Sequence, residues 1–142
     1  MKYLFLILIS LPVYADFNGK FSGTGAAVFH TGKRYECSEV FLDINTSEKS
    51  FKLHQGGYIC GFLKAAFDAF EFTIKDGILF HGNLEMGSVF KKKLQYHYYD
   101  PEDGSTYYLT LVKDDEGQIH YLEEWHDGEK IALTVKGDLK PL

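Results

Sequence analysis

The two tripeptides Tyr35-Glu36-Cys37 and Tyr58-Ile59-Cys60 decide the fold predicted for this chain. They contain its only two cysteines, and in each tripeptide the cysteine stands two residues after a tyrosine. We interpret the tripeptides as the two arms of one long β-hairpin, joined by a disulfide near the open end of the hairpin.

The register of this hairpin follows from its turn. If the turn centres on Glu48-Lys49, Ser47 lies opposite Ser50, and the numbers of every pair of facing residues then sum to 97. Cys37 faces Cys60 in this register, and a non-hydrogen-bonded pair has the Cα spacing that a disulfide needs. The other pairs expected are Ile44 with Leu53, Tyr35 with Phe62 and Glu39 with Tyr58, and Gly56-Gly57 falls opposite Phe41 and Val40 as a bend or bulge.

Residues 1–15 predict the compartment. Met1-Lys2 is a short positive start, and the apolar run from Tyr3 to Leu11 ends at Pro12. Val13-Tyr14-Ala15 places small residues where a signal peptidase cleaves. The run is too short to span a bilayer, so a secretory signal is predicted, with a buried first strand as the alternative.

Export would determine where residues 16–142 are located and whether their two cysteines are oxidised. Residues 16–142 form one predicted domain in the periplasm or outside the cell. In that setting an oxidised pair, Cys37 with Cys60, is expected rather than two free thiols packed as small hydrophobic side chains.

The charge of the chain argues against nucleic acid as a partner. Asp and Glu number 20 against 15 Lys and Arg, giving a net charge of −5, and Arg34 is the only arginine. Nucleic-acid binding needs clustered basic residues. The one basic cluster, Lys91-Lys92-Lys93, is typical of a solvated turn or edge. No apolar run after residue 15 is long enough for a membrane helix.

The pattern after Phe17 predicts an all-β fold. Aromatic and β-branched residues recur at a spacing of two, and short turn signals separate them. These signals are Thr31-Gly32, Ser47-Glu48-Lys49, Asp76-Gly77, Asp100 to Gly104, Asp114 to Gly117 and Asp127-Gly128. About 8 to 10 antiparallel strands in meander order are expected, with one or two helical turns as an alternative within Leu63–Ala69.

Such a meander either closes into an up-and-down barrel or splits into a sandwich. Short hairpins favour the barrel, which also removes the exposed sheet edges that a secreted monomer must otherwise protect. In the first strand, Phe17 to His30, the glycines Gly19, Gly23 and Gly25 share one face. They fit a place where the strand bends sharply or another backbone comes close, as at a barrel corner.

The start of that strand, Gly19-Lys20-Phe21-Ser22-Gly23-Thr24-Gly25, followed by a meander, resembles the calycin superfamily of lipocalin-like barrels. Members usually begin with Gly-x-Trp and carry a late basic residue that packs over the tryptophan. Phe21 stands in place of that tryptophan here, and only Lys136 or Lys140 is available for the basic position. The resemblance implies a barrel that binds a ligand, without indicating which one.

Candidate ligand-binding residues lie on three predicted strands, two of which form a hairpin. Tyr121, Glu123 and Trp125 share one face; if it is interior, Glu123 needs a partner, either a ligand or a structural hydrogen bond. Tyr96 and Tyr98 share a face, and Tyr107 follows across the hairpin. Tyrosines so placed either orient a ligand or pack across strands, and packing alone accounts for them.

Metal and catalytic sites are not predicted. His120 and His126 share a face but lie about 20 Å apart along an extended strand, so one ion cannot bridge them. No nucleophile with a spaced histidine and no phosphate loop occurs. We therefore expect no enzyme activity and no cofactor.

Two functions remain. The first is an exported, monomeric barrel that binds a small apolar or aromatic ligand inside. The second is a non-catalytic protein-interaction module, such as an enzyme inhibitor or envelope-assembly factor, acting through loops like Asp100 to Gly104. An outer-membrane barrel is a poor third, because the chain ends Lys140-Pro141-Leu142 without a terminal aromatic residue.

Overall fold

The computed structural model describes residues 16–142, so the predicted signal segment lies outside the described residues. Strands and turns account for this part of the chain, and no helix occurs in it. The all-β prediction is confirmed, with eleven strands where 8 to 10 were expected. They are β1 (Gly19–Phe29), β2 (Arg34–Thr46), β3 (Ser50–Cys60), β4 (Leu63–Phe67), β5 (Phe70–Lys75), β6 (Ile78–His81), β7 (Leu84–Phe90), β8 (Lys93–Tyr99), β9 (Thr106–Lys113), β10 (Ile119–Asp127) and β11 (Lys130–Pro141).

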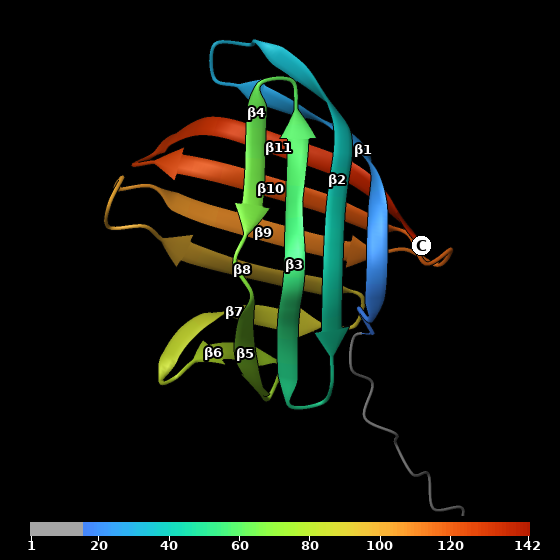
Figure 1. The fold of residues 1–142 in the computed structure, drawn as a ribbon. Coiled ribbons are helices and arrows are strands. Elements are labelled where there is room, and N and C mark those ends of the chain that lie inside the picture. Colours follow the sequence, from blue (N-terminus) through green and yellow to red (C-terminus); the bar gives the residue numbers. More distant parts are fainter. Residues whose placement is uncertain (1–15) are drawn as a thin grey trace, which may run out of the picture.

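The strands form one antiparallel sheet that closes on itself. Its order is β2-β1-β11-β10-β9-β8-β7-β6-β5-β3-β4, and an additional pairing of β2 with β3 closes the ring. Figure 1 shows β2, β3 and β4 lying across β8 to β11, so that the closed sheet has two facing layers. The predicted antiparallel barrel is thus confirmed.

Closure is uneven at β4. Both β4 and β5 pair with the same side of β3, β4 along Gly56–Cys60 and β5 along Ser50–Leu53. The other edge of β4 pairs with no strand in residues 16–142. The ring is therefore completed through β5, and β4 is a short extra strand at one end.

The disulfide Cys37–Cys60 is present, as predicted. The predicted register holds at both ends of the β2–β3 pair, where Cys37 faces Cys60 and Ile44 faces Leu53. Between them two bulges shift the pairing by one residue, because each arm carries one extra residue in turn. The middle pairs were therefore wrong: Glu39 faces Ile59, while Phe41 and Leu42 face Gly57 and Gly56. Phe62 lies in the turn after β3, yet its ring contacts Tyr35 edge-on at 4.8 Å.

Leu63–Phe67 forms β4 and not the helical turns considered for this stretch. A two-residue turn at Gly61 and Phe62 sets Leu63 directly opposite Cys60. Gly61 has a φ of 63°, which such hairpin turns require. Pairing with β3 therefore overrides the weak helical preference of the two alanines.

Glycines in β1 allow close contact with β11 at a corner of the barrel. A Cβ on Gly23 would lie 1.9 Å from the carbonyl oxygen of Asp138, and one on Gly25 would lie 1.9 Å from that of Lys136. A bulge separates the two glycines in the β1–β2 pairing. This explains the glycines predicted at a corner, except Gly19, whose Cβ would meet only the Phe21 ring at 3.8 Å.

One end of the barrel interior is filled by apolar side chains. This end lies where β1, β3 and β10 begin and β2 and β11 finish. The Phe17 backbone N–H donates to Thr46 Oγ1 at 2.9 Å there, which holds the Phe17 ring in the core. We call this the filled end; its side chains, all at most 2% exposed, are Phe17, Phe21, Ile44, Phe51, Leu94, Leu111, Ile119 and Leu139. Within residues 16–142 no helix is long and apolar enough to cross a membrane.

Candidate functional site

The inward face of β10 carries Glu123, the one buried ionisable carboxyl group among the described residues. Tyr121 and Glu123 are 2% and 6% exposed, and Trp125 packs against the core from the same face. Glu123 Oε2 accepts a hydrogen bond from the Tyr121 hydroxyl at 2.9 Å. Burial raises the pKa of Glu123, and the neighbouring Trp125, Tyr121 and Tyr58 side chains oppose that rise.

Tyr58 reaches this carboxyl group from β3, a strand that is not a neighbour of β10 in the sheet. It is fully buried, and its ring meets Phe67 of β4 at 6.0 Å. Burial, followed by the charge of Glu123, raises the pKa of the Tyr58 hydroxyl, so this group stays a protonated donor at neutral pH.

Two buried donors of this cluster make no hydrogen bond. They are the Tyr58 hydroxyl and the Trp125 indole N–H, and neither meets an acceptor at normal hydrogen-bond geometry in the described part of the chain. Both nevertheless lower the pKa of Glu123 through weak hydrogen-bond interactions with its carboxyl group. A buried polar group without a partner is costly and occurs seldom in folded proteins. The cluster therefore has unused hydrogen-bonding capacity.

Tyr96 extends the cluster along β8. Its ring packs edge-on against Phe70 at 5.4 Å and Phe72 at 5.1 Å. Burial first, and the charge of Glu123 second, raise the pKa of Tyr96. Tyr96 thus packs against the core level with Glu123, two strands away in the sheet.

Tyr107 and Tyr98 lie nearer the opposite end of the barrel. The Tyr107 ring meets the Trp125 ring edge-on at 5.1 Å, and its hydroxyl donates to Asp103 Oδ2 at 2.5 Å. Tyr98 is the cross-strand partner of Tyr107 and is 50% exposed. The predicted residues Tyr96, Tyr107, Tyr121, Glu123 and Trp125 therefore lie near one another, while Tyr98 is at the rim.

Further aromatic rings surround that rim. Phe29 at the end of β1 stacks on Phe62 at 6.4 Å and meets Tyr35 at 5.8 Å. Phe62 is 71% exposed. The aromatic end of the barrel, as we define it, consists of Phe29, Tyr35, Phe62, Tyr98, Tyr107 and Trp125.

Tyr58 was not predicted as a site residue, although it is the first residue of the tripeptide Tyr58-Ile59-Cys60. Its place two residues before the inward-facing Cys60 puts it on the inward face of β3, which is a usable signal. Its proximity to Glu123 depends on how β3 and β10 face each other, and no local pattern encodes that.

The two histidines of β10 lie on its outward face with separate partners. His120 Nδ1 bonds to Asp138 at 2.6 Å and His120 Nε2 to Asp114 at 3.0 Å. These two hydrogen bonds raise the pKa of His120. His126 lies 3.6 Å from Glu124. No group of three or more His, Cys, Asp or Glu side chains in residues 16–142 is arranged to hold a metal ion.

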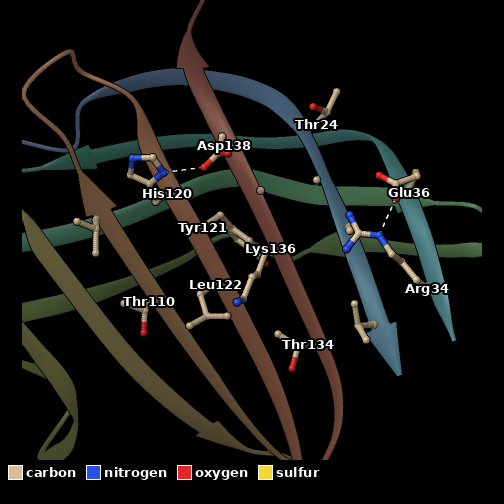
Figure 2. A pocket seen from close by; sticks show the side chains of 15 residues that line it. Thr24, Arg34, Glu36, Thr110, His120, Tyr121, Leu122, Thr134, Lys136 and Asp138 are labelled. Atoms are coloured by element: carbon tan, nitrogen blue, oxygen red, sulfur yellow. Dashed lines mark hydrogen bonds and ion pairs between the residues drawn. The ribbon is translucent and has the colours of Figure 1, made fainter. Parts of the chain in front are cut away.

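A hollow of about 840 Å³ lies on the outer face of the sheet and was not predicted from the sequence. Side chains from β9, β10, β11, β1 and β2 line it (Figure 2). Lys136 is among them, and both Lys136 and Lys140 are exposed and alternate with buried residues of β11. Phe21, by contrast, lies in the core.

Comparisons with known proteins add little to this geometry. No protein-family model matches the chain, and no curated protein matches it. A search of solved structures finds a redesigned β-barrel with 10% sequence identity and a TM-score of 0.47, over 88% of this chain and 90% of that one. The barrel is therefore established by the strand pairing of the chain itself.

Proposed function

We propose that this protein is a binding barrel of the calycin type that holds a small, mainly apolar or aromatic ligand at its aromatic end. The observation that carries this proposal is the pair of buried donors that meet no acceptor at normal hydrogen-bond geometry, Tyr58 and Trp125, beside the buried carboxyl group of Glu123. A ligand with one oxygen atom that accepts both hydrogen bonds would complete the cluster.

The filled end restricts where the ligand lies. Apolar side chains at most 2% exposed occupy that half of the interior. We therefore expect the ligand to enter between Tyr98, Tyr107 and Trp125 and to stop at Tyr58 and Glu123. An aromatic ligand entering there would meet the rings of Tyr107 and Trp125, which contact each other edge-on at 5.1 Å.

A binding role is favoured over a catalytic one. The carboxyl group of Glu123 is surrounded by donors from Tyr121, Tyr58 and Trp125, and none of these is an activated nucleophile. Such an arrangement orients a polar group within an apolar site, as binding sites commonly do.

Calorimetric titration tests the proposal with neutral phenols and aromatic alcohols. We expect binding to the wild type and about fivefold weaker binding to Tyr58→Phe, which removes one hydroxyl and little volume. Tyr108→Phe is the matched control, since Tyr108 is an exposed tyrosine on the outer face. Equal affinity of both variants, or no binding across the panel, would contradict the proposal.

A second candidate function is protein binding through the acidic loop Asp100 to Gly104. This loop is ordered by its own bonds, Asp100 N–H to Ser105 O at 2.9 Å and Gly104 N–H to Asp100 O at 2.8 Å. A preordered loop binds with little loss of conformational freedom. If Glu102→Lys captures the same partners as the wild type in a pull-down, this function is excluded for the loop.

We also propose that the protein is exported and acts as a monomer. The pattern of residues 1–15 supports export, and the presence of a Cys37–Cys60 disulfide agrees with an oxidising compartment. Closure of the sheet supports a monomer, because it leaves few strand edges free to pair with another copy. Sedimentation at one chain's mass would agree with this; a stable dimer would not.

A further inference from the structure

The outer hollow is separate from the aromatic end and has a composition of its own. Its volume of about 840 Å³ lies within the range of small-molecule sites, roughly 300–1,000 Å³. Figure 2 shows an ion pair at either side, Arg34 with Glu36 and His120 with Asp138, and Lys136 between them.

The register of the strands explains why the sheet is hollowed here. Ala26 of β1 lies between Lys136 of β11 and Glu36 of β2. On the other side of Lys136 come Leu122 of β10 and then Thr110 of β9. A short side chain between two long ones forms a floor, and Ala26 is only 8% exposed although it alternates with the inward-facing Ala27.

The acidic groups of the hollow are paired with basic groups. Glu36 Oε1 lies 2.7 Å from Arg34 Nε, and Asp138 Oδ1 lies 2.6 Å from His120 Nδ1. Lys136 has no ion-pair or hydrogen-bond partner for its amino group within residues 16–142. Its ammonium group is thus the basic group of the hollow that makes no direct contact with a carboxylate.

The remaining lining is apolar or carries hydroxyl groups. Val28, Val112 and Leu122 supply aliphatic surface, and Figure 2 shows the Lys136 side chain directed toward Leu122. Thr24, Thr110 and Thr134 add hydroxyl groups that can donate hydrogen bonds. A ligand that fits the Lys136 ammonium, the aliphatic surface and the threonine hydroxyl groups carries one negative charge on an apolar body.

We propose that this outer hollow is a second binding site, which takes a small amphiphilic carboxylate through Lys136. The carboxylate contacts the Lys136 ammonium and a threonine hydroxyl, and the apolar body covers Leu122 and Ala26. A charge-assisted hydrogen bond from lysine to a carboxylate is stronger than a neutral one. The site is independent of the proposed ligand at the aromatic end.

The test uses two probes of the same shape, 1-naphthoate and its neutral counterpart 1-naphthalenemethanol, on isotope-labelled protein by NMR. We expect naphthoate to shift the backbone amide signals of Ala26, Leu122 and Lys136. Lys136→Met should weaken naphthoate binding about tenfold or more and leave binding of the alcohol unchanged.

Two variants serve as controls. Lys136→Arg keeps the charge and should retain most of the affinity for naphthoate. Lys20→Met removes an exposed lysine of β1 that does not line the hollow and should bind like the wild type.

Three results would overturn the proposal. They are equal naphthoate affinity of Lys136→Met and wild type, no amide shifts at millimolar naphthoate, and shifts confined to residues around Tyr58 and Trp125. The last result would place the probe at the aromatic end. Absence of any ligand at the aromatic end would contradict the proposed function and would not affect the proposal for the outer hollow.

Discussion

Glu123 is the residue on which the interior site depends, because the barrel buries its carboxyl group among three donors. Burial raises its pKa above the ordinary value of 4.5. The folded protein therefore holds this proton more tightly than the unfolded chain does. As pH rises above 4.5, ionisation of Glu123 favours unfolding until the folded protein also loses the proton.

The first prediction concerns this carboxyl group. Glu123→Gln keeps the shape of the side chain and cannot ionise, so its stability relative to the wild type should increase as pH rises from 4 toward 7. Urea denaturation of both proteins at several pH values measures the difference. A difference that is constant with pH would mean that Glu123 has no raised pKa.

The second prediction concerns His120 between Asp114 and Asp138, whose hydrogen bonds raise its pKa. Its stabilisation is fully present below pH 6.5 and is lost as pH rises through the folded pKa. His120→Gln should therefore destabilise the protein at pH 5.5 by less than about 1 kcal/mol, since the pair is exposed. The loss should vanish at pH 9; an equal loss at both values would refute this pairing.

At the scale of elements, the β2–β3 hairpin is held by its disulfide. The third prediction is that reduction of Cys37–Cys60 lowers the free energy of unfolding by about 3 kcal/mol, the chain-entropy value for a loop of this length. Urea denaturation with and without reductant measures it. The stability of the double variant Cys37→Ala with Cys60→Ala should not change on addition of reductant. If the wild type is equally stable with and without reductant, the prediction is contradicted.

The corner between β1 and β11 yields the fourth prediction. A methyl group at Gly25 would meet the Lys136 carbonyl oxygen at 1.9 Å, and only backbone movement relieves that contact. Gly25→Ala should therefore lower stability by about 2 kcal/mol or more. Ser22→Ala, on the same strand, is the control and should change it by about 0.5 kcal/mol at most. Wild-type stability of Gly25→Ala would show that the strands separate easily.

The sequence predicted elements well where local chemistry determines them. The Ser47–Ser50 turn and the two cysteines fixed the ends of the β2–β3 register, but alternation alone does not reveal the two compensating bulges between them. Helical preference suggested the wrong state for Leu63–Phe67, because pairing with β3 is a tertiary effect.

The candidate sites likewise combine features set by local sequence with features set by tertiary structure. The shared face of Tyr121, Glu123 and Trp125 follows from alternation on one strand. The approach of Tyr58 to Glu123 does not, because β3 and β10 are not sheet neighbours. The outer hollow depends on residues of five strands brought into register, which no single segment encodes.

At the scale of the whole molecule, export and the disulfide make one joint expectation, which is our fifth prediction. Mass spectrometry of the secreted protein should show a chain that begins at Asp16 and is lighter by two hydrogen atoms than its reduced form. A chain that retains Met1, or one that takes up two thiol labels without reduction, would contradict export in an oxidised state.

The central claim is that a ligand binds at the aromatic end beside Trp125, the only tryptophan in the chain. Its indole N–H gives a single NMR signal, and this N–H meets no acceptor at normal hydrogen-bond geometry among the described residues. We predict that a neutral phenol or aromatic alcohol that binds the wild type moves this signal until saturation, and moves it less in Tyr58→Phe at equal concentration. A bound ligand that leaves the indole signal unmoved would contradict the claim.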